Sequence, residues 1–169
     1  NNNVQLDWET VADLESGTSY YQVLIASTNQ FTLITFSSNA AGSSAYSADM
    51  PDNTWYWKVR TADLAGNIGD YSSIRSFTTD ISSPAAPAME TTVPVDSAAF
   101  NNGNIQLGWE VVTDTVSGTS NYFIQVATTP DFTLVTFSSG PTGQSAYAAG
   151  LSENFYYWKV RTRDNAGNI

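Results

Sequence analysis

The sequence predicts an all-β protein made of two tandem β-sandwiches, and three observations lead to this fold class. Large side chains alternate with polar ones at every second position in several segments, which is typical of half-buried strands. The chain repeats itself at an offset of 101 residues, which predicts two copies of one structural unit. Aromatic residues make up 13% of the chain and charged residues only 13%, a composition that favours strands over helices.

The internal repeat sets the domain organisation. Residues 5–68 align with residues 106–169 without a gap, and about 37 of the 64 aligned positions are identical, as tandem duplication leaves them. Between the copies, residues 80–87 read D-I-S-S-P-A-A-P, a short linker that two prolines stiffen. The boundary is therefore expected near residue 83, which gives domains at 1–83 and 84–169.

The strands of the first copy follow in chain order over residues 4–8, 21–25, 55–61 and 71–79. In the first three, alternation places one set of large side chains on the inner face and mostly polar ones on the outer face. The side chains expected inside are Val4, Leu6, Trp8, Tyr21, Val23, Ile25, Trp55, Trp57, Val59 and Thr61.

Turn signals separate these strands, and no segment shows a helical period. Short strands between regularly spaced turns are typical of a sandwich or barrel. The turn signals are Ser16-Gly17, Ala41-Gly42, Asp52-Asn53, Ala65-Gly66-Asn67 and, in the second copy, Asn102-Gly103.

The whole succession resembles bacterial or archaeal fibronectin type III repeats. The resemblance rests on L-D-W-E, D-L-E-S-G-T-S-Y-Y-Q-V, Q-F-T, W-Y-W-K-V-R-T-A-D-L-A-G-N-I and Y-S-S-I-R-S-F-T. It implies fibronectin type III or immunoglobulin-like sandwiches with Trp8 and Trp109 at the centre of each core. The family's buried tyrosine maps onto Tyr156, whereas Trp55 holds that place in the first copy and lacks the hydroxyl.

The two copies are cut in different registers. Residues 87–100 have no counterpart before Asn1, and residues 69–79 have none after Ile169. We therefore expect the first strand to be missing from 1–83 and the last strand from 84–169. Either the full protein continues in both directions, or neighbouring units complete each other's open sheet edges.

The amino-acid composition argues against catalysis, nucleic-acid binding and membrane insertion. With no His and no Cys, the usual nucleophile and general-base systems are absent, and Lys58 and Lys159 are expected to point outward. A net charge of −10 with six Lys and Arg disfavours nucleic acid, and no apolar run is long enough for membrane insertion. We expect no enzyme and no organic cofactor, and an extracellular or cell-surface location.

The best polar constellation lies in two loops of each copy that the resemblance brings to one pole of the sandwich. Carboxylate and amide oxygens there could bind Ca²⁺; alternatively, they cap their own turns. The candidate ligands are Asp13, Asp63 and Asn67 in the first copy and Asp114, Asp164 and Asn168 in the second.

A second candidate is an outward face that carries aromatic and basic side chains. Exposed aromatics beside Arg can contact a glycan or a protein partner, or Lys and Arg stems can simply cover the rings. The candidate interface residues are Leu24, Tyr56, Lys58, Arg60, Phe123, Tyr157, Lys159 and Arg161.

Two functions remain open on the sequence. The main reading is a non-catalytic structural repeat of an extracellular stalk, filament or cell-surface adhesin, whose partners are neighbouring repeats or copies of itself. The alternative is an accessory or carbohydrate-binding module of a secreted polysaccharide-degrading enzyme.

Overall fold

The computed structural model describes residues 3–47, 49–89 and 93–169, and every regular element in them is a β-strand. Two compact units form, Asn1–Ile81 and Ser82–Ile169, with the division just before the predicted residue 83. Within the described residues no helix is long and apolar enough to cross a membrane. Hereafter the two halves are called unit 1 and unit 2.

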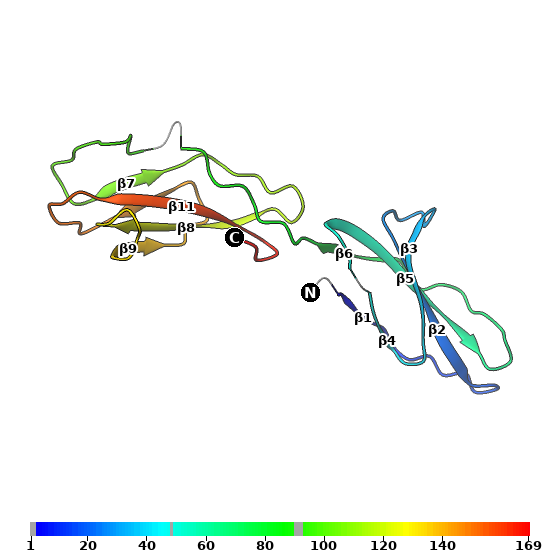
Figure 1. The fold of residues 1–169 in the computed structure, drawn as a ribbon. Coiled ribbons are helices and arrows are strands. Elements are labelled where there is room, and N and C mark those ends of the chain that lie inside the picture. Colours follow the sequence, from blue (N-terminus) through cyan, green and yellow to red (C-terminus); the bar gives the residue numbers. More distant parts are fainter. Residues whose placement is uncertain (1–2, 48, 90–92) are drawn as a thin grey trace. The chain divides into compact units, whose positions relative to one another are not determined.

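Unit 1 is a sandwich of a four-stranded and a two-stranded antiparallel sheet (Figure 1). The larger sheet has the order β3-β2-β5-β6, and the smaller pairs β1 with β4. The strands are β1 (Gln5–Asp7), β2 (Thr18–Ala26), β3 (Ile34–Ala40), β4 (Ser44–Tyr46), β5 (Asn53–Asp63) and β6 (Arg75–Thr79).

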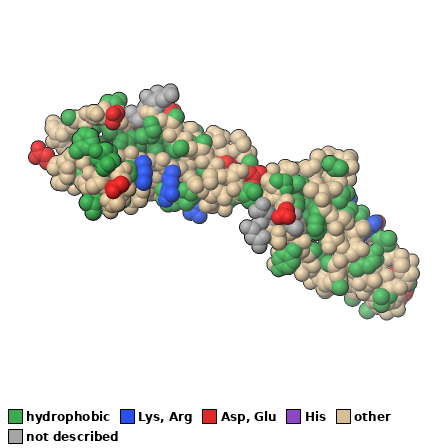
Figure 2. Space-filling model, viewed as in Figure 1, with side chains coloured by type: hydrophobic (Ala, Val, Ile, Leu, Met, Phe, Trp, Pro, Cys, Tyr) green, Lys and Arg blue, Asp and Glu red, His purple; other side chains and the backbone are tan. Residues whose placement is uncertain are grey.

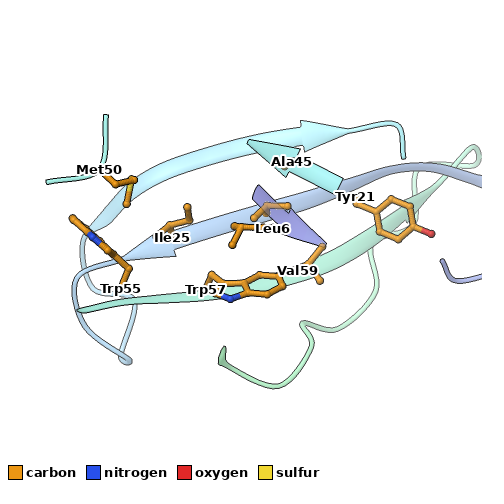
Figure 3. Close-up of a cluster of buried hydrophobic side chains, with 9 residues drawn as sticks. Leu6, Tyr21, Ile25, Ala45, Met50, Trp55, Trp57 and Val59 are labelled. Atoms are coloured by element: carbon orange, nitrogen blue, oxygen red, sulfur yellow. The ribbon is translucent and has the colours of Figure 1, made fainter. Parts of the chain in front are cut away.

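The core of unit 1 lies between these two sheets (Figure 3). Inward side chains of β2 and β5, such as Ile25 and Trp57, face Leu6 of β1 and Ala45 of β4. The alternation read from the sequence is confirmed here, because Tyr21, Val23, Ile25, Trp55, Trp57 and Val59 are all buried.

Unit 2 repeats the arrangement with fewer strands. A three-stranded sheet has the order β11-β8-β9, and β7 pairs with β10. Its core contains Leu107, Trp109, Tyr122, Ile124 and Val126. The strands are β7 (Ile105–Gly108), β8 (Thr119–Ala127), β9 (Val135–Ser139), β10 (Ser145–Ala148) and β11 (Tyr157–Asp164).

The two tryptophans expected at the core centres differ in how deeply they are buried. Trp109 is buried, but Trp8 is only partly buried and packs at the margin of its cluster, 5.6 Å from the Tyr21 ring. The prediction is therefore correct for Trp109 and wrong for Trp8. In unit 2 the chain before β7 contacts the Trp109 region, where Glu110 N donates to Ala88 O.

The strand expected over residues 71–79 is shorter than predicted. It spans only Arg75–Thr79, which pairs with β5. Upstream, Ser72 N donates to Val59 O, but Val59 N donates to the Ser72 hydroxyl instead of a backbone carbonyl. A side-chain acceptor replaces a ladder carbonyl at this point, so regular pairing begins later.

Trp55 makes the corner bond that its missing hydroxyl had placed in question. In unit 2, Tyr156 Oη donates to Ser152 O at 3.1 Å. In unit 1, Trp55 Nε1 donates to Pro51 O at 3.2 Å and to Thr79 Oγ1 at 2.8 Å. The indole N–H reaches the carbonyl four residues back, as the phenol does.

Candidate functional site

The loop residues proposed for calcium in unit 1 do come together. Asp13 accepts hydrogen bonds from Glu15 N at 3.0 Å and Ser16 Oγ at 2.7 Å. Asp63 accepts two from Asn67, one from the backbone N and one from Nδ2, both at 2.7 Å. The loops are joined where Leu64 N donates to the carbonyl of Gly17, whose φ of 82° suits a residue without Cβ.

These bonds tune the two carboxyls. The Ser16 hydroxyl, followed by the Glu15 N–H, lowers the pKa of Asp13, while the neighbouring Asp63 charge opposes that change. The Asn67 side-chain amide is the main cause of the lowered pKa of Asp63. Both carboxylates are stabilised by donors of their own turns.

Unit 2 builds the same loops with more backbone donors. Asp114 Oδ1 accepts from the N–H groups of Val116, Ser117 and Gly118 at 2.8–3.0 Å. Asp164, only 1% exposed, accepts from Gly167 N at 2.6 Å and from Asn168 N and Nδ2 at 2.8 and 2.7 Å. An oxygen of Asp114 lies within 4.8 Å of one of Asp164.

The arrangement in both units is that of aspartates capping turns. Each carboxylate accepts N–H or O–H donors, which occupy lone pairs that a cation would need. Ca²⁺ takes six to eight oxygen ligands, and the amides of Asn67 and Asn168 use their nitrogen, not their oxygen, toward the aspartates. Calcium binding at these loops stays a prediction.

The proposed outward face of unit 1 forms across β2 and β5, where Leu24 lies opposite Lys58, and Gln22 opposite Arg60. Lys58 Nζ lies 4.2 Å from the ring centroids of both Phe31 and Tyr71. The Arg60 guanidinium lies 4.5 Å from the Tyr71 centroid, and its Nε donates to Gln22 Oε1 at 2.8 Å. Of the remaining candidates, Tyr56 is partly buried opposite Ala26.

The matching face of unit 2 repeats part of this pattern. Lys159 Nζ lies 3.9 Å from the Phe132 centroid, and Arg161 lies 5.8 Å from that of Phe123. Tyr157 packs edge-on against Phe155 at 5.2 Å. Phe123 and Arg161 border a shallow depression of about 360 Å³ that Ser138 and Gly140 also line.

The sequence analysis did not identify the aromatic rings of Phe31 and Phe132, which contact Lys58 and Lys159. Phe31 and Phe132 lie at the turns before β3 and β9, with φ of 55° and 56°. Their backbone N–H groups bond to Thr28 O and Thr129 O. A large residue at positive φ is unusual, and the repeated F-T-L was the one available signal.

Asp131 was missed as well. Thr129 Oγ1 donates to its carboxylate at 2.6 Å, and this bond is the main cause of its lowered pKa. The first copy has Gln30 at the position of Asp131, although Thr28, Phe31 and Thr32 around it match their counterparts in the second copy. Comparison of the copies could therefore not find it.

Figure 2 shows the exposed surface of both units as mostly uncharged side chains and backbone, with scattered acidic and basic groups. No large field of one charge covers the visible face of either unit. The face seen in Figure 2 therefore has no continuous basic patch of the kind that attracts a polyanion.

No family model matches the sequence. The chain is 30% identical over 180 residues to Exoglucanase B of Cellulomonas fimi, an alignment that covers 99% of this chain. It is 32% identical over 126 residues to Endoglucanase B of Cellulomonas fimi, covering 70% of this chain. These alignments span only 15% and 11% of the two relatives' own lengths.

A solved structure confirms the fold. The crystal structure of chicken CNTN1 FN1-FN3 domains matches 99% of this chain and 58% of that chain, with a TM-score of 0.52 and 15% sequence identity. At this identity the likeness establishes the fold alone. The two units are fibronectin type III-like sandwiches.

Proposed function

We propose that the chain is a pair of non-catalytic fibronectin type III-like accessory modules within a larger, secreted polysaccharide-degrading enzyme. This proposal rests on the two glucanase alignments. They cover 99% and 70% of this chain, but only 15% and 11% of the lengths of the two glucanases. A segment of that kind is an appended module, because the greater part of each glucanase lies outside it. This is the alternative that the sequence had left open.

The side chains support a non-catalytic role. Asp114 and Asp164 lie close enough to be compared with a glycosidase pair, whose carboxyls are about 5–5.5 Å apart in retaining enzymes. Asp164 is buried, however, and both carboxylates accept backbone N–H groups of their own turns. Burial keeps Asp164 away from a substrate, and the backbone bonds to both carboxylates hold the two loops in place.

The outer faces favour spacing over sugar binding. Aromatic platforms for sugars present bare ring faces, but Lys58 lies over Phe31 and Tyr71, and Lys159 over Phe132. The rings therefore already have partners within their unit. We assign the modules the role of separating and positioning other parts of the enzyme.

The experiment compares the parent enzyme with a variant that lacks residues 1–169. We expect equal rates on soluble carboxymethyl cellulose and a slower rate on crystalline cellulose, because only an insoluble surface demands correct spacing. The control is a second variant in which a Gly/Ser linker of matched reach replaces residues 1–169. The proposal would be overturned if the parent enzyme and the deletion variant had equal rates on crystalline cellulose as well as on the soluble substrate. A parent protein without a hydrolase region would also overturn it.

A stalk or filament segment is a second candidate, supported by the duplication at 101 residues. Stacked repeats that contact only their neighbours provide length. The number of copies in the parent protein separates the two roles. A long array without a hydrolase region favours the stalk, and two copies beside a hydrolase region favour the accessory module.

A further inference from the structure

The smaller sheet of unit 2 has an outward face that carries no charge. β7 and β10 pair so that Gln106 lies opposite Tyr147, and Gly108 opposite Ser145. Successive side chains of a strand point to opposite faces of a sheet, and Leu107, between Gln106 and Gly108, is buried in the core. The outward face therefore consists of the two paired positions on each strand.

The smaller sheet of unit 1 presents nearly the same face. Gln5 lies opposite Tyr46, and Asp7 opposite Ser44. The glutamine, the serine and the tyrosine are identical in the two copies, and only Asp7 differs from its glycine counterpart. The outward faces of the two smaller sheets are called the tyrosine faces below.

The two tyrosine rings are open to solvent. Tyr46 is 63% exposed and Tyr147 is 58% exposed. Among the described residues, neither ring has an aromatic or cationic neighbour. On the larger sheets, by contrast, the rings of Phe31, Tyr71 and Phe132 lie under a lysine ammonium group. The bare ring surface that the larger sheets lack is thus present on the smaller ones.

The exposure of the tyrosine does not depend on the segment that precedes the unit. In unit 2 this segment is present, and Val93 exchanges two backbone hydrogen bonds with Gly108 of β7. Tyr147 belongs to β10, which pairs with β7, and its side chain remains open although Val93 is in place. The open ring is therefore a property of the complete side of the sandwich.

Each ring lies beside polar groups that can bind hydroxyls. In the part of the chain that the structure describes, the Tyr147 hydroxyl and the Gln106 amide have no hydrogen-bond partner. In unit 1, Tyr46 Oη donates to Gln5 Oε1 at 2.9 Å, and Gln5 Nε2 donates to Asp7 Oδ1 at 3.0 Å, both at the surface. Amide and phenol groups both donate and accept hydrogen bonds, so they can orient a polyhydroxylated ligand on the ring.

We propose that the tyrosine faces are contact sites for a neutral, β-linked glucan chain. The apolar C–H face of a glucose ring packs on Tyr46 or Tyr147, and its hydroxyls bond to Gln5 or Gln106. An uncharged face suits an uncharged polymer, and a flat sheet surface suits an extended, ribbon-like chain. This inference rests on the proposed function and adds direct contact with the polysaccharide to the spacing role.

The experiment titrates cellohexaose into the full chain and follows backbone amide signals by NMR. We expect saturable shifts at Gln106 and Tyr147 and at Gln5 and Tyr46. The dissociation constant should be in the millimolar range, because one open ring buries little surface. Tyr147→Ala should weaken binding at unit 2 at least tenfold by removing the ring. It should leave the shifts in unit 1 unchanged, so each unit is a control for the other.

Two further variants separate the ring from general effects. Tyr157→Ala removes another exposed tyrosine of unit 2, which lies on β11 of the larger sheet, and should leave binding unchanged. Tyr147→Phe keeps the ring and should retain most of the affinity. An unchanged melting temperature of the Tyr147→Ala variant confirms that it is folded.

Four results would overturn the inference. The first two are no shift at Gln106 or Tyr147 in millimolar cellohexaose, and equal weakening by Tyr147→Ala and Tyr157→Ala. The third is equal binding of maltohexaose, whose α-linked chain curls and cannot lie flat on the sheet. The fourth is a shift of the same signals with protein concentration alone, because that would identify a second copy of the chain as the occupant.

The titration and the deletion experiment fail independently of each other. No shift with cellohexaose, together with a slower deletion variant on crystalline cellulose, would overturn the glucan contact and leave the spacing role in place. Equal rates of the parent enzyme and the deletion variant would overturn the proposed function, whatever the titration shows.

Discussion

At the scale of single residues, the two copies achieve the same bond with different side chains. Trp55 and Tyr156 both donate to the carbonyl four residues back, that of Pro51 and that of Ser152. Trp55 is also buried and bonds to Thr79, whose hydroxyl in turn donates to Pro51 O. The indole therefore belongs to a small closed network, whereas the phenol of Tyr156 makes its bond at an exposed site.

This difference predicts unequal costs for removing the donor. Trp55→Phe removes the N–H donor of Thr79 Oγ1 and leaves Pro51 O with the Thr79 hydroxyl alone. The lost bond and lost packing together should cost about 2–4 kcal/mol in this buried setting. Tyr156→Phe should cost only about 0.5–1.5 kcal/mol. Urea unfolding of the full chain measures both, with Trp55→Tyr as the control that keeps a polar tip. Equal costs would contradict the network.

The turn aspartates predict a loss of stability in acid. Donors of their own turns lower the pKa values of Asp13, Asp63 and Asp131 from the ordinary value of an aspartate. A lowered folded pKa stabilises the protein above the unfolded value, and that stabilisation is lost as the pH falls through the folded value. Thermal melts at pH 7 and pH 3 should show a lower midpoint at pH 3. In the Asp13→Asn variant the melting midpoint should fall by less between pH 7 and pH 3.

At the scale of elements, the period of two was enough to orient three strands. Tyr21, Val23 and Ile25 could be placed inside because their alternation leaves one face apolar. The end of a strand depends on hydrogen bonds that the pattern does not contain. The Ser72 hydroxyl, which takes the bond from Val59 N, shortens the last strand of unit 1 with no change in the spacing of large residues.

Loop residues were harder to assign than strand residues for a related reason. The aspartates of the candidate site could be grouped because two loops at one end of a sandwich approach each other. Whether their oxygens face an ion or their own N–H groups depends on turn geometry, such as the three donors around Asp114. Phe31 likewise reaches Lys58 only because its turn adopts a positive φ.

The aromatic cover of the outer sheet faces predicts a measurable coupling. A double-mutant cycle with Lys58→Met and Phe31→Leu should give an interaction free energy of about 0.5–1 kcal/mol. Both substitutions keep apolar contact, so the cycle isolates the charge–ring term. The matched cycle in unit 2, with Lys159→Met and Phe132→Leu, should give a similar value from the 3.9 Å contact. A coupling near zero in both would show that the rings are free for another partner.

At the scale of the whole molecule, the calcium hypothesis concerns both units at once. A site typical of extracellular modules, with a dissociation constant of about 10⁻⁴–10⁻³ M, would add about 0.5–1.5 kcal/mol at millimolar Ca²⁺. The turn-capping bonds predict instead that melts in EDTA and in millimolar Ca²⁺ coincide. A higher midpoint in Ca²⁺, lost in Asp63→Asn and Asp164→Asn variants, would establish the metal site. Mg²⁺ at the same concentration controls for ionic strength.

The two core clusters contain different residues, so each unit has the means to unfold by itself. Trp109→Ala should cost about 3–5 kcal/mol, because Trp109 is buried and packs on Tyr122 with ring centroids 5.3 Å apart. Trp8→Ala should cost less, because Trp8 is only partly buried and its removal exposes less apolar surface that was covered before. NMR signals of the full chain during urea unfolding report on both units separately. Loss of unit 2 signals at lower urea in the Trp109→Ala variant, with unit 1 unchanged, is the expected result. A shift of both units together would mean that their stabilities are coupled. Equal costs at Trp8 and Trp109 would mean that Trp8 is buried as fully as Trp109 in solution.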